Sequence, residues 1–258
     1  MSVYVAIGDS QSEGVGDDPW PDGTPRGWAD RLAARLAQVD DEVLYANLAV
    51  RGKTADKVLA EQLGPTLALA PDLVTVTAGV NDLLEPHRDT AAVLATLDRL
   101  VADLRAAGAT VVLVRSPELH ALTLPGRLIA RRVAAFNAGL TEIAARRGAL
   151  APAPGRGSVF EDLRAWSPDR LHLSALGHER LARGVGEALG LPDCAGWAAP
   201  PAGIPPHRTV ASEIDWARAH LLPWAARRVR RISSADGRCA KRPVPQPVTP
   251  GTCVTEAG

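Results

Sequence analysis

The sequence predicts an α/β fold in which a mainly parallel β-sheet is covered by helices on both faces. Short runs of β-branched and aliphatic residues alternate along the chain with longer segments whose apolar residues recur every three or four positions. The apolar runs are nearly continuous, as expected for strands that are buried on both faces. Strands that alternate with helices in this way are typical of a parallel sheet.

Each element follows from this pattern in chain order. Four apolar runs predict strands at Val3 to Ile7, Val43 to Ala49, Leu73 to Thr77 and Thr110 to Val114. A fifth, short strand is expected near residues 149–151. The intervening helices are predicted at Trp28 to Val39, Thr54 to Leu63, Thr90 to Ala107 and Gly126 to Arg147, and a further helix is expected to begin near Ser174.

The first predicted strand ends in a glycine turn that contains a serine. The segment from Gly8 to Gly14 reads Gly-Asp-Ser-Gln-Ser-Glu-Gly, so Ser10 follows the strand almost directly. Glycine lets the backbone bend sharply, which holds the serine hydroxyl clear of the chain where a base can reach it. Taken alone, the same residues also fit an ordinary turn.

Three further polar segments supply what a serine nucleophile needs. The stretch 47–52 follows the run Val43 to Ala46 in the second strand, 79–82 follows the third strand, and 169–172 precedes the helix near Ser174. A serine hydroxyl requires a base within hydrogen-bond reach, and the histidine side chain suits that task, so His172 is the candidate. Asp169 lies three residues earlier, close enough within one turn to orient the imidazole. We therefore expect a catalytic triad of Ser10, His172 and Asp169.

With these four segments in this order, the chain resembles the SGNH (GDSL) hydrolase family over about residues 3–190. The resemblance implies a three-layer α/β/α flavodoxin-like sandwich with a central, mainly parallel five-stranded sheet, and a serine hydrolase that acts on ester bonds. It also implies an oxyanion hole formed by the backbone N–H groups of Ser10 and Gly52 and the side-chain amide of Asn81. The order Ser, Asp, His is shared with α/β-hydrolases, but no Gly-x-Ser-x-Gly elbow surrounds Ser10.

Each segment also has a purely structural interpretation. Gly52 fits a strand-to-helix turn in which Thr54 caps the next helix, and Asn81 with Asp82 fits a turn or capping pair. His172 fits a surface loop. Their conjunction favours catalysis, because Ser10, Gly52 and Asn81 all follow predicted parallel strands, whose carboxyl ends meet at the ligand-binding edge of such sheets.

Composition excludes several other function classes. The 258 residues carry 29 Lys and Arg against 29 Asp and Glu, so the net charge of zero gives no electrostatic basis for binding nucleic acid. The glycines from Gly8 to Gly16 match neither a dinucleotide-binding nor a P-loop spacing. His172 and His178 are six residues apart and form no His-Glu-x-x-His pattern, and we place His178 on the helix after the triad. We therefore expect neither a metal ion nor a cofactor.

The termini bear on location. Met1 leads directly into the first strand, without a basic n-region or an apolar signal-peptide segment, and no stretch reaches the roughly 18 apolar residues of a membrane span. A cytoplasmic protein is the expectation. Cys194, Cys239 and Cys253 all follow the catalytic region, and their odd number argues against a closed disulfide framework.

From about residue 192 the composition changes, since ten of the 21 prolines fall in residues 192–258. We interpret 1–191 as the catalytic domain and 192–258 as a Pro-rich extension with an irregular or disordered end. A helix is expected at about 212–231, interrupted at Pro223 and carrying aromatic, leucine and arginine residues. Trp216 and Trp224 would dock it on the catalytic domain, or its aromatic and basic faces would bind a membrane surface or an acidic partner.

The substrate is the least determined property. Ser116 to Leu128 and the polar stretch from Glu13 to Pro25 are candidate walls of the acyl pocket. No long apolar groove or lid is evident, so we favour short acyl chains. The expected function is hydrolysis of a small-molecule carboxylic ester through an acyl-enzyme. An acyltransferase, a carbohydrate O-acetylesterase and a catalytically silent binding module are the alternatives, and the oligomeric state is left open.

Overall fold

The computed structural model describes residues 2–117, 124–230, 234–235 and 237–249. Its centre is a five-stranded sheet with the strand order β4-β3-β1-β2-β5. The four strands β1 to β4 are parallel, and Tyr4 of β1 lies between Tyr45 of β2 and Leu73 of β3. The strands are β1 (Val3–Gly8), β2 (Leu44–Asn47), β3 (Leu73–Thr77), β4 (Thr110–Leu113) and β5 (Arg242–Pro247).

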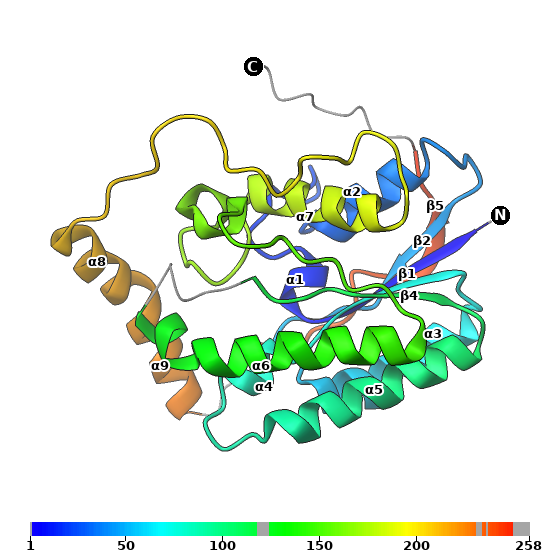
Figure 1. The fold of residues 1–258 in the computed structure, drawn as a ribbon, viewed down its shortest axis with the longest axis horizontal. Coiled ribbons are helices and arrows are strands. Elements are labelled where there is room, and N and C mark those ends of the chain that lie inside the picture. Colours follow the sequence, from blue (N-terminus) through cyan, green and yellow to red (C-terminus); the bar gives the residue numbers. More distant parts are fainter. Residues whose placement is uncertain (1, 118–123, 231–233, 236, 250–258) are drawn as a thin grey trace.

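Helices cover both faces of this sheet, which gives the three layers seen in Figure 1. Successive residues of β1 point to opposite faces: Val5 and Ile7 pack in one core, and Tyr4 and Ala6 pack in the other. The first core lies under α3 (Ala55–Ala68), α5 (Thr90–Ala106) and α6 (Leu124–Arg147), and the second under α2 (Trp28–Leu36) and α7 (Ala175–Ala188). The predicted α/β sandwich is therefore confirmed.

Two one-turn helices follow strands at the carboxyl edge of the sheet. They are α1 (Ser10–Glu13) after β1 and α4 (Val80–Leu83) after β3. The side chain of Asp9 caps α1 by accepting the N–H of Gln11 at 3.1 Å. Short 3₁₀ turns at Val159–Glu161 and Leu163–Ala165 precede the segment that leads into α7.

The fifth strand of the sheet differs from the prediction. Residues 149–151 form only a single parallel bridge, in which Leu150 lies beside Val112 of β4. The fifth strand is β5, which pairs antiparallel with β2 and comes from the Pro-rich end that was predicted to be irregular. Pro243, Pro245 and Pro247 occupy alternate positions, so the side without N–H donors faces away from β2, which an edge strand tolerates.

Two predictions that a helix ends or breaks beside a proline were wrong. The helix α3 continues past Pro65 to Ala68, whereas its end was predicted at Leu63. In the C-terminal extension, α8 (Val210–Trp216), a π-helical turn (Ala217–Leu221) and α9 (Leu222–Val229) follow without a break, so Pro223 does not interrupt the helix. The wide π-helical turn just before Pro223 leaves room for its ring, which would otherwise clash with the preceding turn.

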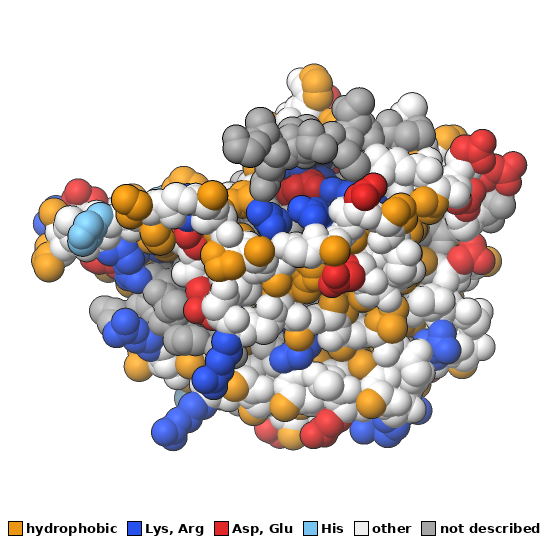
Figure 2. Space-filling model, turned by 45° about the horizontal axis from the view of Figure 1, so that its top comes forward, with side chains coloured by type: hydrophobic (Ala, Val, Ile, Leu, Met, Phe, Trp, Pro, Cys, Tyr) orange, Lys and Arg blue, Asp and Glu red, His pale blue; other side chains and the backbone are white. Residues whose placement is uncertain are grey.

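Figure 1 places α8 and α9 at the end of the molecule to which the carboxyl edge of the sheet points, beside the start of α6. Over the described part of the chain, no helix has both the length and the apolar character that crossing a membrane requires. Cationic and anionic side chains are interspersed on the face seen in Figure 2, in keeping with a net charge of zero.

Candidate active site

Ser10 is the first residue of α1, directly beyond the carboxyl end of β1. The turn before it needs glycine: Gly8 has a φ of 131°, and a Cβ there would lie 1.9 Å from the carbonyl oxygen of Thr77. Ser10 is half-buried, whereas the hydroxyl of Ser12, two residues later, is fully buried and bonds to Thr77 Oγ1 at 2.6 Å. Of these two serines, Ser10 is thus the one accessible to a ligand.

Asp169 and His172 lie together in the loop before α7. His172 Nδ1 and Asp169 Oδ2 are 2.6 Å apart, and Asp169 Oδ1 accepts the backbone N–H groups of Leu171 and His172 and the hydroxyl of Ser167. An ionised carboxylate can only accept, so Nδ1 carries the proton and Nε2 is free to accept another. Burial acts to raise the pKa of Asp169, but these hydrogen bonds and the charge of His172 outweigh it and hold that pKa well below its ordinary value.

This loop lies against the turn that carries Ser10. The side-chain amide of Gln11, the neighbour of Ser10, donates to the carbonyl of Leu171 at 3.0 Å. Gly16 lies so close to the loop that a Cβ there would be 3.0 Å from the Cβ of His172. The structure therefore brings together residues that are more than 150 positions apart, and Ser10, Asp169 and His172 share one region of the surface.

The side chain of Asn81 connects the turns that carry Ser10 and Gly52. Its Nδ2 donates to Asp9 Oδ2 at 3.3 Å and to the carbonyl of Lys53 at 3.0 Å. Asp9 precedes Ser10 and Lys53 follows Gly52, so the amide of Asn81 lies between the two backbone N–H groups expected in the oxyanion hole. Within the described residues, neither of those N–H groups donates to a protein acceptor.

Gly52 lies in the turn after β2 with a φ of 78°, a conformation that favours glycine. Thr54 occupies the N-cap position of α3 but makes no side-chain capping bond. Asp82 takes this role instead, because its Oδ2 accepts the N–H of Ala55 at 2.9 Å. Asp82 follows Asn81, so the capping contact also ties Asn81 to the Gly52 turn. Sequence spacing contains no sign of this contact, because the two residues belong to different strand-helix units.

Two buried titratable groups surround the site. Burial raises the pKa of Asp9 to about 7, against the opposing effects of the Gln11 hydrogen bond and the charge of His172. His178 lies on α7, as predicted, and burial lowers its pKa to about 4. Its Nδ1 accepts the N–H of Trp28 and its Nε2 donates to the carbonyl of Val15, both at 3.1 Å. This pairing requires the neutral imidazole, so His178 is structural.

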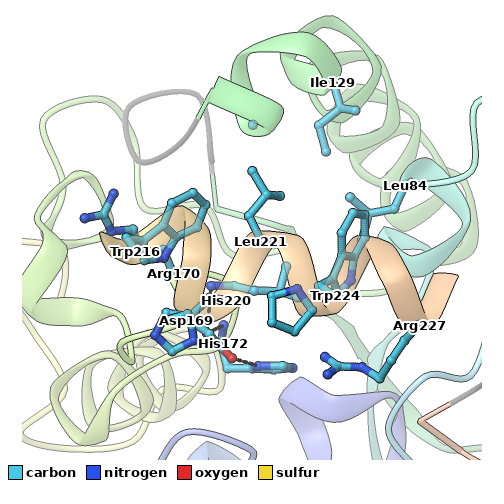
Figure 3. Close-up of a pocket in the computed structure, with 14 residues that line it drawn as sticks. Leu84, Ile129, Asp169, Arg170, His172, Trp216, His220, Leu221, Trp224 and Arg227 are labelled. Carbon is cyan, nitrogen blue, oxygen red and sulfur yellow. Dashed lines mark hydrogen bonds and ion pairs between the residues drawn. The ribbon is translucent and has the colours of Figure 1, made fainter. Parts of the chain in front are cut away.

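Two cavities adjoin the site. A cavity of about 40 Å³ lies next to the turn of Ser10, with Asp9 and Gln11 in its wall. A larger cavity of about 280 Å³ lies beside His172. In Figure 3 the helical segment 216–227 crosses above Asp169 and His172, and its side chains, together with Leu84 and Ile129, surround the larger space.

The predicted walls of the acyl pocket are found only in part. Of the stretch from Ser116 to Leu128, Ser116 and Pro117 line the small cavity and Gly126 lines the larger one. Leu128 is 85% exposed, and residues 118–123, including His120, lie outside the described residues. The stretch from Glu13 to Pro25 lines neither of these two cavities. Trp216 and Trp224 line the larger cavity, and they are the residues through which one of the two interpretations of the sequence docked this helix on the catalytic domain.

The described residues contain no cluster of three or more His, Cys, Asp or Glu side chains placed to bind a metal ion. Cys194 is buried, Cys239 is exposed and both are free thiols, while Cys253 lies outside the described residues.

Comparison with known proteins agrees with this arrangement. A model of the GDSL-like lipase/acylhydrolase family matches residues 6–180. The crystal structure of TesA is 27% identical, with a TM-score of 0.61, and the match covers 73% of this chain and 98% of that chain. No curated protein matches the sequence.

Two less similar structures share the fold. Axe2, an acetylxylan esterase from Geobacillus stearothermophilus, is 19% identical with a TM-score of 0.62, over 76% of this chain and 96% of that chain. LAE5, an alpha/beta hydrolase enzyme from the metagenome of Lake Arreo, is 22% identical with a TM-score of 0.61, over 73% and 95%. The chain therefore belongs to the GDSL-like lipase/acylhydrolase family and is an SGNH-type serine hydrolase that acts on esters.

Proposed function

We propose that this enzyme hydrolyses a small carboxylic ester through an acyl-enzyme formed on Ser10. The observation that carries the proposal is the 2.6 Å contact between Asp169 and His172 in a loop that bonds to the neighbour of Ser10. Asp169 orients His172 with Nδ1 protonated, so that Nε2 can take the proton of the Ser10 hydroxyl as its oxygen attacks the ester carbonyl. The C–O bond to the alcohol then breaks, and His172 returns the proton to the leaving alkoxide.

In the second half-reaction His172 removes a proton from water, the resulting hydroxide attacks the acyl-enzyme, and Ser10 recovers its proton as the acid leaves. Negative charge develops on the carbonyl oxygen in both steps. The N–H groups of Ser10 and Gly52 and the amide of Asn81 would donate to this oxygen. The 3.3 Å bond from Asn81 to Asp9 is the longer of its two bonds, and it is the bond that the oxyanion would replace.

We propose a short acyl group, as the sequence also favoured. The space beside the turn of Ser10 is a cavity of about 40 Å³. A water molecule takes up roughly 30 Å³ in the liquid, so this space favours a group of very few heavy atoms, such as acetyl, over a long acyl chain.

A time course on p-nitrophenyl esters from acetate to palmitate tests the proposal, with each variant also exposed to a fluorophosphonate probe. The wild-type enzyme should be labelled and should prefer the short esters, whereas Ser10→Ala should neither react with the probe nor turn over. Ser12→Ala is the matched control, because the hydroxyl it removes is bonded to Thr77. Turnover by Ser10→Ala, or labelling that Ser12→Ala abolishes and Ser10→Ala does not, would refute Ser10 as the nucleophile.

A further inference from the structure

The larger cavity is built to a great extent by a part of the chain outside the matched family region. We call residues 210–229, which comprise α8, the π-helical turn and α9, the roof segment. Of the described residues that line the cavity, half belong to it, among them Trp216, Leu221 and Trp224. The family match ends at residue 180. TesA and Axe2 are covered almost completely by about three quarters of this chain, so the shared fold does not account for the whole of this enzyme.

The roof segment is fastened to the loop that carries the proposed acid-base pair. Arg170 Nη1 lies 2.9 Å from both carboxylate oxygens of Glu213 in α8, and its guanidinium lies over the ring of Trp216 at 4.8 Å. Arg170 lies between Asp169 and His172 and has a φ of 55°, in the left-handed region that non-glycine residues adopt only when their surroundings enforce it. A second cation, Arg208, bonds to the same carboxylate at 2.8 and 3.0 Å.

Apolar side chains make up the larger part of the cavity wall, which also includes Asp169, Arg170, His172, His220 and Arg227. Trp216, Leu221 and Trp224 face it from the roof segment, and Leu84 and Ile129 face it from the opposite side, as Figure 3 shows. Its volume of about 280 Å³ lies near the lower end of the roughly 300 to 1,000 Å³ of pockets that bind drug-sized ligands. A single alkyl chain of modest length or one aromatic ring fits this description, and a long-chain lipid does not.

The position of the cavity indicates which part of the ester it receives. Among the described residues, neither cavity has Ser10 in its wall: the larger one borders His172, whereas the small one borders Asp9 and Gln11 on either side of Ser10 but not His172. In an acyl transfer the acyl group stays on the serine beside the oxyanion donors, and the alcohol leaves on the side of the base that returns its proton. A cavity that borders the base therefore lies on the alcohol side.

We propose that the roof segment forms the binding site for the alcohol group of the substrate, so that the enzyme selects short-acyl esters of apolar alkyl or aryl-alkyl alcohols. This inference rests on the proposed function, because it assumes that His172 returns a proton to the leaving alcohol. The acyl group lies in the small cavity next to the turn of Ser10, and the alcohol lies between Trp216, Trp224 and Leu84. Arg170 holds the roof segment against the loop that carries Asp169 and His172.

The test varies the alcohol while the acyl group stays constant. Hydrolysis of ethyl, butyl, hexyl and phenethyl acetate is followed in a pH-stat for the wild type, Trp224→Ala, Leu221→Ala and Leu222→Ala. These alcohols have similar acidity, so differences in kcat/KM report binding in the transition state. Leu222 is the matched control, because it is a neighbour of Leu221 on the same segment but is 60% exposed and does not line the cavity.

We expect Trp224→Ala and Leu221→Ala to lower kcat/KM for hexyl and phenethyl acetate by about tenfold or more, the cost of losing one well-buried apolar contact. Ethyl acetate should change little, and Leu222→Ala should resemble the wild type. Deacylation of the acetyl-enzyme, measured after the burst with p-nitrophenyl acetate, should not change because the alcohol has already left.

Equal losses for ethyl and hexyl acetate would overturn the inference. So would a change in preference along p-nitrophenyl esters of increasing acyl length with no change along the alcohols, since that result would make the cavity an acyl pocket. Failure of the proposed function is separate: it would appear as turnover by Ser10→Ala, whatever the roof variants do.

Discussion

Glu13 and Arg51 join the turn of Ser10 to the turn of Gly52. Glu13 ends α1, and its carboxylate accepts three hydrogen bonds from Arg51. The backbone N–H of Arg51 donates at 2.6 Å, and the side-chain Nε and Nη2 of Arg51 donate at 2.9 and 2.6 Å. The Glu13 side chain is only 9% exposed, so solvent screens the ion pair little. The pair therefore joins the turn of the proposed nucleophile to the turn of the proposed oxyanion donor, although neither residue reacts.

We expect Glu13→Gln to lower kcat by about tenfold and to leave KM nearly unchanged, because displacing a catalytic group by an ångström can cost up to about 100-fold. Steady-state kinetics on p-nitrophenyl acetate measure both constants. Glu61→Gln is the control, since Glu61 pairs with Lys53 beside the same turn but not with α1. Equal losses in the two variants would show that the charge at this turn matters rather than the link to α1.

Removal of the Asn81 amide should slow acyl transfer strongly. Asn81→Ala removes one of the three donors that we assign to the oxyanion, and such a loss typically lowers kcat by about 10² to 10³-fold. KM should change much less, because the charge develops only in the transition state. The same kinetic assay measures the effect, and a kcat within about threefold of the wild type would exclude Asn81 from the oxyanion hole.

Stability should depend on pH through His178. Burial lowers its pKa to about 4, so between that value and the ordinary histidine pKa of about 6.5 the unfolded chain binds more protons than the folded one. This residue therefore stabilises the fold fully above about pH 6.5, and its contribution is lost as the pH falls toward 4. By linkage the loss between pH 7 and pH 5 is about 2 kcal/mol.

Asp9 acts in the opposite direction. Burial raises its pKa to about 7, so its contribution to stability decreases as the pH rises from about 4 to 7. Comparison of wild type with His178→Gln in urea unfolding at pH 7 and pH 5 separates the two groups, because Asp9 is present in both. Between pH 7 and pH 5, the free energy of unfolding of the variant should fall by about 2 kcal/mol less than that of the wild type. His207→Gln, at an exposed histidine, should keep the wild-type pH dependence.

We expect a buried ion pair beside the C-terminal strand β5 to contribute strongly to the stability of the fold. Lys241, just before β5, is 7% exposed, and its Nζ donates to Asp30 Oδ2 at 2.5 Å and to the carbonyls of Pro25 and Arg26 at 2.7 and 2.6 Å. Lys241→Met leaves the Asp30 carboxylate buried without its cation, which typically costs about 3 to 5 kcal/mol.

Urea unfolding measures this cost. The double variant Asp30→Asn with Lys241→Met should recover part of it, because no buried charge is then left uncompensated. Lys57→Met, on the exposed side of α3, is the control and should have no measurable effect. A loss below about 1 kcal/mol in Lys241→Met would show that β5 is held by its strand pairing alone.

The ion pair between Glu213 of the roof segment and Arg170, in the loop that carries Asp169 and His172, can be tested by a double-mutant cycle. Arg170→Met and Glu213→Gln each remove the ion pair that joins α8 to the loop. Each should lower kcat/KM for hexyl acetate several-fold, and the double variant should lose less than the sum of the two single losses, since both variants break the Arg170–Glu213 pair while each also removes a contact of its own, with Trp216 or with Arg208. Additive losses would show that Arg170 and Glu213 act independently.

The sequence by itself determined the layout of the parallel sheet and the polar segments at its carboxyl edge. Buried parallel strands require continuous apolar runs, and each run is local, so the four strands β1 to β4 were predicted within a few residues of their observed bounds. Once those strands are parallel, the residues that follow them must meet at one edge. Ser10, Gly52 and Asn81 do so in the structure.

Only the tertiary structure decided which segment forms the fifth strand of the sheet and which segments enclose the site. The strand β5, the Glu13–Arg51 and Asp82–Ala55 contacts, and the roof segment over His172 all join residues far apart in the sequence. Local composition indicated disorder for a Pro-rich strand, because the partner that pairs with its remaining N–H groups is about 200 residues away. The shape of a cavity belongs to none of its segments alone, so the alcohol-binding space that we propose emerges only when they are packed together.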